Sequence, residues 1–219
     1  MTVNDSSGLG NNGTVVNTAE WGPGTLILSA TNKAVVKIPI VSSAFPVLNG
    51  AKTVSLWVYY DRVATANTNF VVLSDGVTSV DLASSAVQFE VRDGVLKVGG
   101  SHTAIYVTTT VAPPAAAAWH HLVYTDDGAG THAIYVDGVT THATFAGALP
   151  VGPTPCVLIG SWTTDSTSPW FEHLEASVAD VRVYNRALSQ DEVTASCNAG
   201  RSGAPNRVDA SGSYDASGS

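Results

Sequence analysis

The sequence lacks any long apolar segment and any basic stretch at its start. A membrane-spanning helix needs about 20 consecutive apolar residues, and no such run is present. A secretory signal peptide begins with a basic segment followed by an apolar one, and the first residues, Met-Thr-Val-Asn-Asp, do not show this pattern. We therefore expect no membrane insertion and no signal peptide in this chain.

Charge is scarce, and basic charge is scarcer than acidic. Only 13% of the 219 residues are charged, and 10 basic against 18 acidic residues give a formal net charge of -8. Such a chain repels phosphate backbones and anionic lipid surfaces. This balance excludes nucleic acid as an expected partner.

Cysteine is also rare. Cys156 and Cys197 are the two cysteines, so the chain can form at most one internal disulfide. Two separate buried thiols are an equally good reading of the same residues. In either case the fold must rest on an apolar core, and 219 residues are enough for one large domain.

The residues that are abundant favour strands. Apolar and polar side chains alternate at residues 119–125, 54–60 and 87–98, with the period of two that places neighbours on opposite faces of a strand. Asp93-Gly94 and Asp137-Gly138 supply the residues that tight hairpin turns require. The sequence thus predicts an all-β fold, an antiparallel β-sandwich of the jelly-roll type.

One helix is expected near the C-terminus. Ser189 and Glu192 have the spacing of a capping box, which predicts a short helix over residues 190–196. Residues after 199 are rich in Ser, Gly, Ala and Asp and too poor in apolar side chains to fold alone. We expect a domain at residues 1–198 and a flexible tail at 199–219.

Three segments carry a family resemblance. Residues 5–14 read DSSGLGNNGT, close to a DSSGNGNNGT opening; residues 119–138 resemble a WHHVxxTYDG...LYVDG signature; and residues 180–189 read DVRVYNRALS, close to DVRIYNRALS. Together the chain resembles laminin-G-like domains of the concanavalin A-like lectin/glucanase superfamily. This resemblance implies two curved, packed sheets. Residues 26–30 and 34–39 resemble a strand pair of the same family.

No catalytic constellation is evident, so we expect that the chain is not an enzyme. Glycosidases of this superfamily carry acidic residues on alternate positions of one strand, with two carboxyl groups about 5 Å apart in retaining enzymes. Glu90 and Asp93 straddle a turn instead, and Glu172 and Glu175 fall in an expected loop. All four read as solvated carboxylates. His120 and His121 are adjacent on a strand and cannot both ligate one ion.

A structural calcium ion is the one cofactor that the resemblance implies. Related domains often hold calcium between the opening loop and the late acidic strand, which implies Asp5 and Asp180 as ligands here. Ala179 replaces the first acidic residue of that late pair. The alternative is that Asp5 begins a turn and Asp180 pairs with a nearby basic or amide group.

A loop at residues 161–173 has the composition of a carbohydrate site. Sugars stack on aromatic rings and use a few polar groups for orientation, and this loop holds both kinds of residue. The candidate ligand-binding residues are Trp162, Asp165, Trp170, Phe171 and His173. The same aromatic side chains could instead close one end of the sandwich or form a subunit contact.

The expected function is therefore a non-catalytic recognition module that binds carbohydrate or a glycosylated surface. The alternative is a structural or assembly protein, a component of a virion surface, a fibre or an adhesin, in which the sandwich contacts other subunits. A glycan or glycoprotein partner belongs to the first reading, and a homo-oligomer or capsid or adhesin subunits to the second. Either role places the chain outside the cell or on a particle or cell surface.

Overall fold

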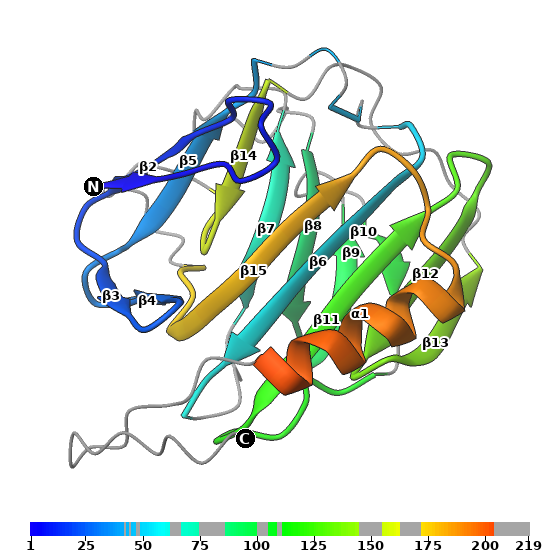
Figure 1. Ribbon diagram of the computed structural model, residues 1–219. Coiled ribbons are helices and arrows are strands. Elements are labelled where there is room, and N and C mark those ends of the chain that lie inside the picture. Colours follow the sequence, from blue (N-terminus) through cyan, green and yellow to red (C-terminus); the bar gives the residue numbers. More distant parts are fainter. Residues whose placement is uncertain are drawn as a thin grey trace.

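The computed structural model describes residues 1–41, 43, 45–46, 49–61, 67–74, 86–99, 105–108, 111–144, 155–162 and 172–203. Within these residues the chain forms two antiparallel sheets packed face to face, with one helix on the outside (Figure 1). The predicted all-β sandwich with a C-terminal helix is confirmed.

The first sheet has eight described strands. Their spatial order is β1 (Thr2–Val3), β2 (Gly13–Val16), β5 (Val35–Pro39), β14 (Cys156–Ile159), β7 (Thr68–Ser74), β8 (Ala86–Arg92), β9 (Val95–Gly99) and β10 (Ile105–Thr108).

The second sheet has seven described strands. Their spatial order is β13 (Val139–Thr144), β12 (Thr131–Val136), β11 (Trp119–Asp126), β6 (Lys52–Tyr59), β15 (Ala176–Tyr184), β4 (Thr25–Leu28) and β3 (Glu20–Gly22). Strands β4 and β5 both form where the sequence predicts them, but they lie in different sheets. A turn at Lys33, whose φ is 51°, carries the chain from one sheet to the other.

The core lies between the sheets. It is built from alternate residues of each strand, such as Phe89 and Val91 of β8 against Leu56 of β6 and Leu122 of β11, all at most 1% exposed. Every residue of β6 is buried, because its second face is also covered. The predicted position of β6 inside the sandwich is confirmed.

Two hairpin turns form as predicted. Asp93-Gly94 joins β8 to β9, and Asp137-Gly138 joins β12 to β13. All four residues have positive φ, between 54° and 81°, which is the backbone conformation of a two-residue turn that matches the twist of paired strands.

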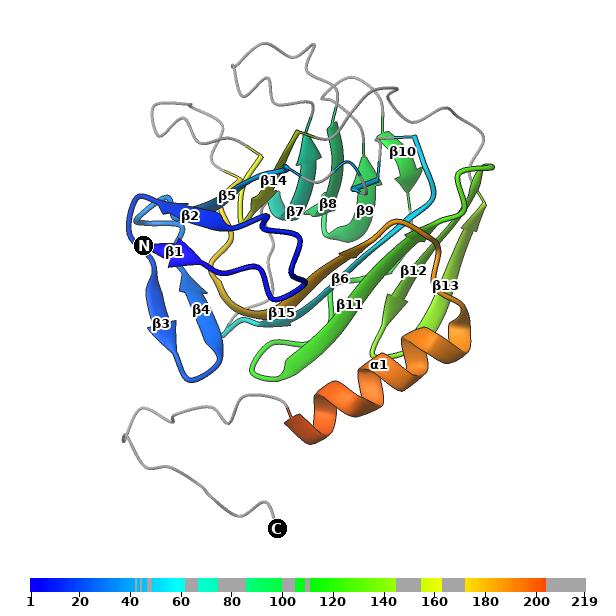
Figure 2. The ribbon, with the colours of Figure 1, turned by 45° about the horizontal axis from the view of Figure 1, so that its top comes forward.

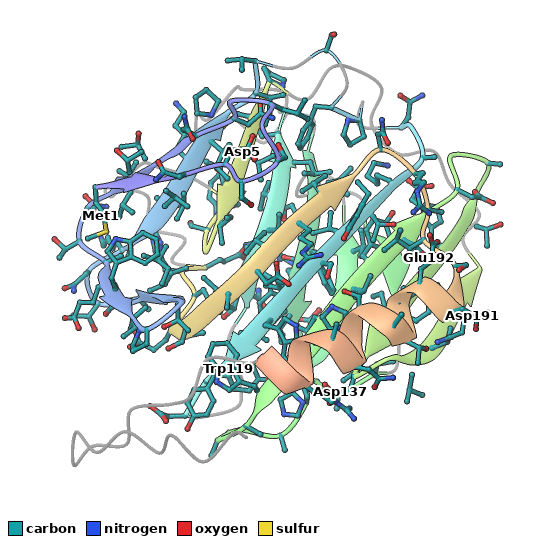
Figure 3. The ribbon with its side chains drawn as sticks, viewed as in Figure 1. Met1, Asp5, Trp119, Asp137, Asp191 and Glu192 are labelled. Atoms are coloured by element: carbon teal, nitrogen blue, oxygen red, sulfur yellow. The ribbon has the colours of Figure 1, made fainter. Side chains whose placement is uncertain are left out.

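Helix α1 (Gln190–Gly203) covers the outer face of the second sheet (Figure 2). The capping box forms: the Glu192 N–H donates to Ser189 Oγ, and the Ser189 N–H donates to Glu192 Oε2 at 2.9 Å. Figure 3 shows Glu192 at this first turn. The helix runs seven residues past the predicted end at 196, because Cys197 packs against Trp57 and Ala179 and extends the contact with the sheet.

The cysteines are two separate buried thiols. Cys156 lies on β14 in the first sheet, and Cys197 lies on α1 against the second. No helix in the described part of the chain has the length and apolar character needed to cross a membrane.

Candidate functional site

The first sheet has an outer face that is turned away from the core. Several charged side chains on or beside this face are nevertheless buried, among them Glu90, Lys97 and Glu172. On β8, Val87, Phe89 and Val91 point into the core. Side chains alternate along a strand, so Gln88, Glu90 and Arg92 point to the outer face. The period of two on β8 therefore places two charged side chains together.

These side chains form a polar cluster, defined here as Asn69, Glu90, Arg92, Lys97 and Glu172. Arg92 donates from Nε to Glu90 Oε1 at 2.9 Å and from Nη2 to Glu172 Oε1 at 3.0 Å. The same Nη2 lies 3.1 Å from Glu90 Oε2. One guanidinium thus holds two carboxylates from distant parts of the chain.

The remaining members fix the edges of the polar cluster. Asn69 Nδ2 donates to Glu172 Oε2 at 2.8 Å. Lys97 lies beside Glu90 in the strand register and donates to Asp93 at 2.7 Å. Asn69 Oδ1 is buried and has no hydrogen-bond partner among the residues that the structure describes.

The expectation that Glu90 and Glu172 are solvated is wrong. The Glu90 side chain is 2% exposed and that of Glu172 is 9% exposed. Burial raises the pKa of Glu90 above its usual range, and the neighbouring Arg92 opposes this shift. Glu172 could not be placed from sequence because its partner lies 80 residues away, whereas the alternation on β8 was a signal for Glu90 and Arg92.

Beside the polar cluster lies an apolar patch on the same outer face, made of Val35, Val72, Cys156 and Leu158. Trp162 packs against this patch. The patch spans β5, β14 and β7, and the polar cluster spans β7, β8 and β9, so the two adjoin at β7. These four residues are at most 3% exposed, so the patch is covered in this structure and Trp162 is its partly exposed neighbour. Apolar residues next to directional polar groups are the usual composition of a ligand site.

The ends of the predicted loop are held at this junction. The Gly160 N–H donates to Phe70 O at 3.0 Å, the Leu174 N–H to Gly160 O at 2.7 Å, and the Asn69 N–H to Glu172 O at 3.3 Å. These bonds bring the start and end of the loop at residues 161–173 to β7, where the polar cluster and the apolar patch meet.

The predicted loop residues have different outcomes. Trp162 is partly buried against the apolar patch, and His173 is 7% exposed. Burial lowers the pKa of His173, and the positive charge of Lys33 adds to this effect. Asp165, Trp170 and Phe171 lie outside the described residues.

The two predicted calcium ligands make contacts of their own. Asp5 lies in the loop after β1 (Figure 3) and accepts the N–H groups of Ser7 and Asn11 at 2.8 and 2.9 Å. A hydrogen bond from the Ser7 side chain, together with these two N–H groups, lowers the pKa of Asp5. Asp180 pairs with Arg182 at 2.6 Å. Among the described residues, no hydrogen-bond or ion-pair partner of Asp5 is also a partner of Asp180. The calcium ion stays a prediction.

The family follows from comparison with known proteins. A family model described as the concanavalin A-like lectin/glucanases superfamily matches residues 31–194. The chain belongs to this superfamily. None of the curated proteins is similar enough in sequence to match it.

Solved structures share the fold of this superfamily member. Domain 4 of AbnA, an extracellular GH43 arabinanase from Geobacillus stearothermophilus solved with arabinotriose, is 20% identical, with a TM-score of 0.65 over 88% of this chain and 91% of that one. The binding domain of botulinum neurotoxin DC, solved with rat synaptotagmin II, is 11% identical, with a TM-score of 0.64 over 89% and 48%. The chain spans about half the length of that toxin domain.

Proposed function

We propose that this chain is a non-catalytic recognition module that binds carbohydrate on the outer face of its first sheet. The observation that carries the proposal is the junction of the polar cluster with the apolar patch, beside both ends of the aromatic loop. The fold it shares with a domain solved with arabinotriose supports the same reading. A ligand at this place lies over β7 and β8.

The groups at the junction suit sugar hydroxyls. A hydroxyl both donates and accepts a hydrogen bond; Glu172, 9% exposed, can accept, and Arg92, 17% exposed, can donate. Trp162, seated on the apolar patch, offers apolar surface for the C–H face of a sugar ring. Asp165, Trp170 and Phe171 complete the proposed site from the loop.

The same geometry favours binding over hydrolysis. A retaining glycosidase needs one carboxyl group as acid and a second as nucleophile, about 5 Å apart. Here Arg92 bonds to both Glu90 and Glu172, so each carboxylate is engaged by the same guanidinium. A carboxylate tied to a guanidinium is a poor nucleophile, so we expect bound oligosaccharides to remain intact.

A glycan array of the purified chain, run with and without calcium, tests the proposal. Trp162→Ala and Glu172→Gln should each reduce binding at least tenfold without loss of the folded state by circular dichroism. Trp21→Ala is the matched control, because Trp21 is 51% exposed on β3 of the other sheet and should bind like the unmodified chain. Loss of binding on calcium removal would support the predicted ion at Asp5 and Asp180.

An assembly role is the second candidate, and one observation favours it. Trp21 and Ile27 are 51% and 37% exposed on the β3–β4 hairpin, at the edge of the second sheet. Exposed edge strands are common places for contacts between chains. Light scattering that shows an oligomer broken by Trp21→Ala, together with an array that shows no binding, would favour assembly over glycan recognition.

A further inference from the structure

A lysine and an aspartate are in contact inside the sandwich, away from the proposed ligand site. Lys52 begins β6 and Asp126 ends β11, and the two are direct partners in the strand register. Lys52 Nζ lies 2.5 Å from Asp126 Oδ2, and the side chains are 0% and 1% exposed. Bulk water is therefore excluded from the contact.

The surroundings orient the aspartate and leave one oxygen facing the amine. The Gly128 N–H donates to Asp126 Oδ1 at 2.8 Å. His132 Nδ1 lies 3.8 Å from the same oxygen and 2.8 Å from the hydroxyl of Tyr124. Oδ1 is thus held by the protein, and Oδ2 is presented to Lys52.

The environment also disfavours the charged amine. Burial lowers the pKa of Lys52 below its ordinary value, and the Asp126 charge opposes this only in part. A buried ion pair is costly to desolvate, so a neutral product of the same two groups is favoured in this place. The family signature given above has Tyr where this chain has Asp126, so the pair is a departure of this sequence.

We propose that Lys52 and Asp126 condense to an intramolecular amide, an isopeptide bond between β6 and β11. The nitrogen lone pair attacks Cγ of Asp126, and the bond from Cγ to Oδ2 breaks. Before the attack the Lys52 ammonium passes one proton to Oδ2, and after it a second proton moves from nitrogen to Oδ2. Oδ2 then leaves as water, the third proton stays on the amide nitrogen, and the reaction needs no other reactant. Oδ1 becomes the amide oxygen, and the Gly128 N–H stabilises the negative charge that develops on it.

Proximity accounts for the rate. Two groups held in contact react as though each were at very high concentration. The buried site also keeps bulk water away from the amide once it has formed. The bond would join the segments on either side of residues 53–125. It is independent of the proposed carbohydrate site, which lies on the outer face of the other sheet.

The intact mass of the full chain tests this directly. Under denaturing conditions it should be lower than the sequence mass by one water molecule, and Lys52→Arg, which keeps the positive charge, should show its full sequence mass. Lys97→Arg is the matched control, because Lys97 pairs with an exposed Asp93, and it should still lack one water. Tryptic digestion should yield one branched peptide that contains both Lys52 and Asp126.

Dehydration at an Asp-Gly step must be distinguished from this bond, because it also removes one water. Asp75-Gly76, Asp93-Gly94, Asp127-Gly128 and Asp137-Gly138 are such steps. Hydroxylamine opens the cyclic imide that they form and leaves an amide intact. Two results would overturn the proposal. One is a chain of full sequence mass that yields an unbranched Lys52 peptide; the other is a chain that lacks one water but whose mass deficit disappears after hydroxylamine treatment.

Discussion

Two basic side chains determine how buried carboxylates behave in this sandwich. Arg92 lies between Glu90 and Glu172 and bonds to both, so each carboxylate has a cationic partner. Lys52 pairs with one carboxylate, that of Asp126, within the described part of the chain. The first arrangement gives a polar surface that can hydrogen bond to a ligand, and the second brings an amine and a carboxyl group together for condensation.

At the same scale, His121 makes stability depend on pH. It is 1% exposed and stacks on Trp57, and burial lowers its pKa to about 4, against about 6.5 in an unfolded chain. Between these values the unfolded state binds more protons, so the free energy of unfolding rises with pH. His121 should therefore contribute about 3 kcal/mol at pH 7 that is lost as the pH falls from about 6.5 to 4.

Urea unfolding at several pH values between 4 and 7 measures this effect. His121→Phe keeps the stacking and removes the titration, so its stability should change less with pH. Burial also lowers the pKa of His132 and His173, which act in the same direction, so part of the slope should remain. Equal slopes in the variant and the unmodified chain would contradict the assignment.

At the scale of elements, the seating of α1 depends on Gly200. A Cβ at this position would overlap Trp57 Nε1, and Trp57 stacks on His121 of the neighbouring strand β11. Alanine normally favours a helix over glycine by about 1 kcal/mol, but overpacking costs about 1–3 kcal/mol. Gly200→Ala should therefore destabilise the chain and lift the last turns of α1 from the sheet.

Thermal unfolding and amide hydrogen exchange in α1 measure this displacement. Asn198→Ala is the matched control, because Asn198 is exposed on the same helix. It should leave exchange in α1 unchanged, whereas Gly200→Ala should speed exchange after Val193. Equal protection in the two variants would show that the helix does not rest on Trp57 in this way.

At the scale of the whole molecule, local patterns predicted the architecture well. The alternation on β6, β8 and β11, the Asp-Gly turns and the capping box at Ser189 each depend on residues close in sequence, and all are confirmed. The C-terminal end of α1 was missed, because the contact of Cys197 with Trp57 joins distant segments.

The candidate site was predictable only in part for the same reason. The loop at residues 161–173 was identified from its own composition, and the structure anchors its ends beside β7. The polar cluster joins Glu90 and Arg92 of one hairpin to Glu172 of the loop. No local pattern could indicate that pairing. Because of it, Glu90 and Glu172 are buried, whereas the sequence predicted solvated carboxylates.

The most direct test of the central claim follows the five tryptophan indole N–H signals by NMR during titration with a glycan. Arabinotriose is the first probe, followed by the strongest ligand from the array. The account predicts shifts at Trp162 and Trp170, with Trp21 on the other sheet and Trp57 and Trp119 near α1 unchanged. Shifts confined to Trp21, Trp57 or Trp119, or no shift with any glycan, would contradict a carbohydrate site on the outer face of the first sheet.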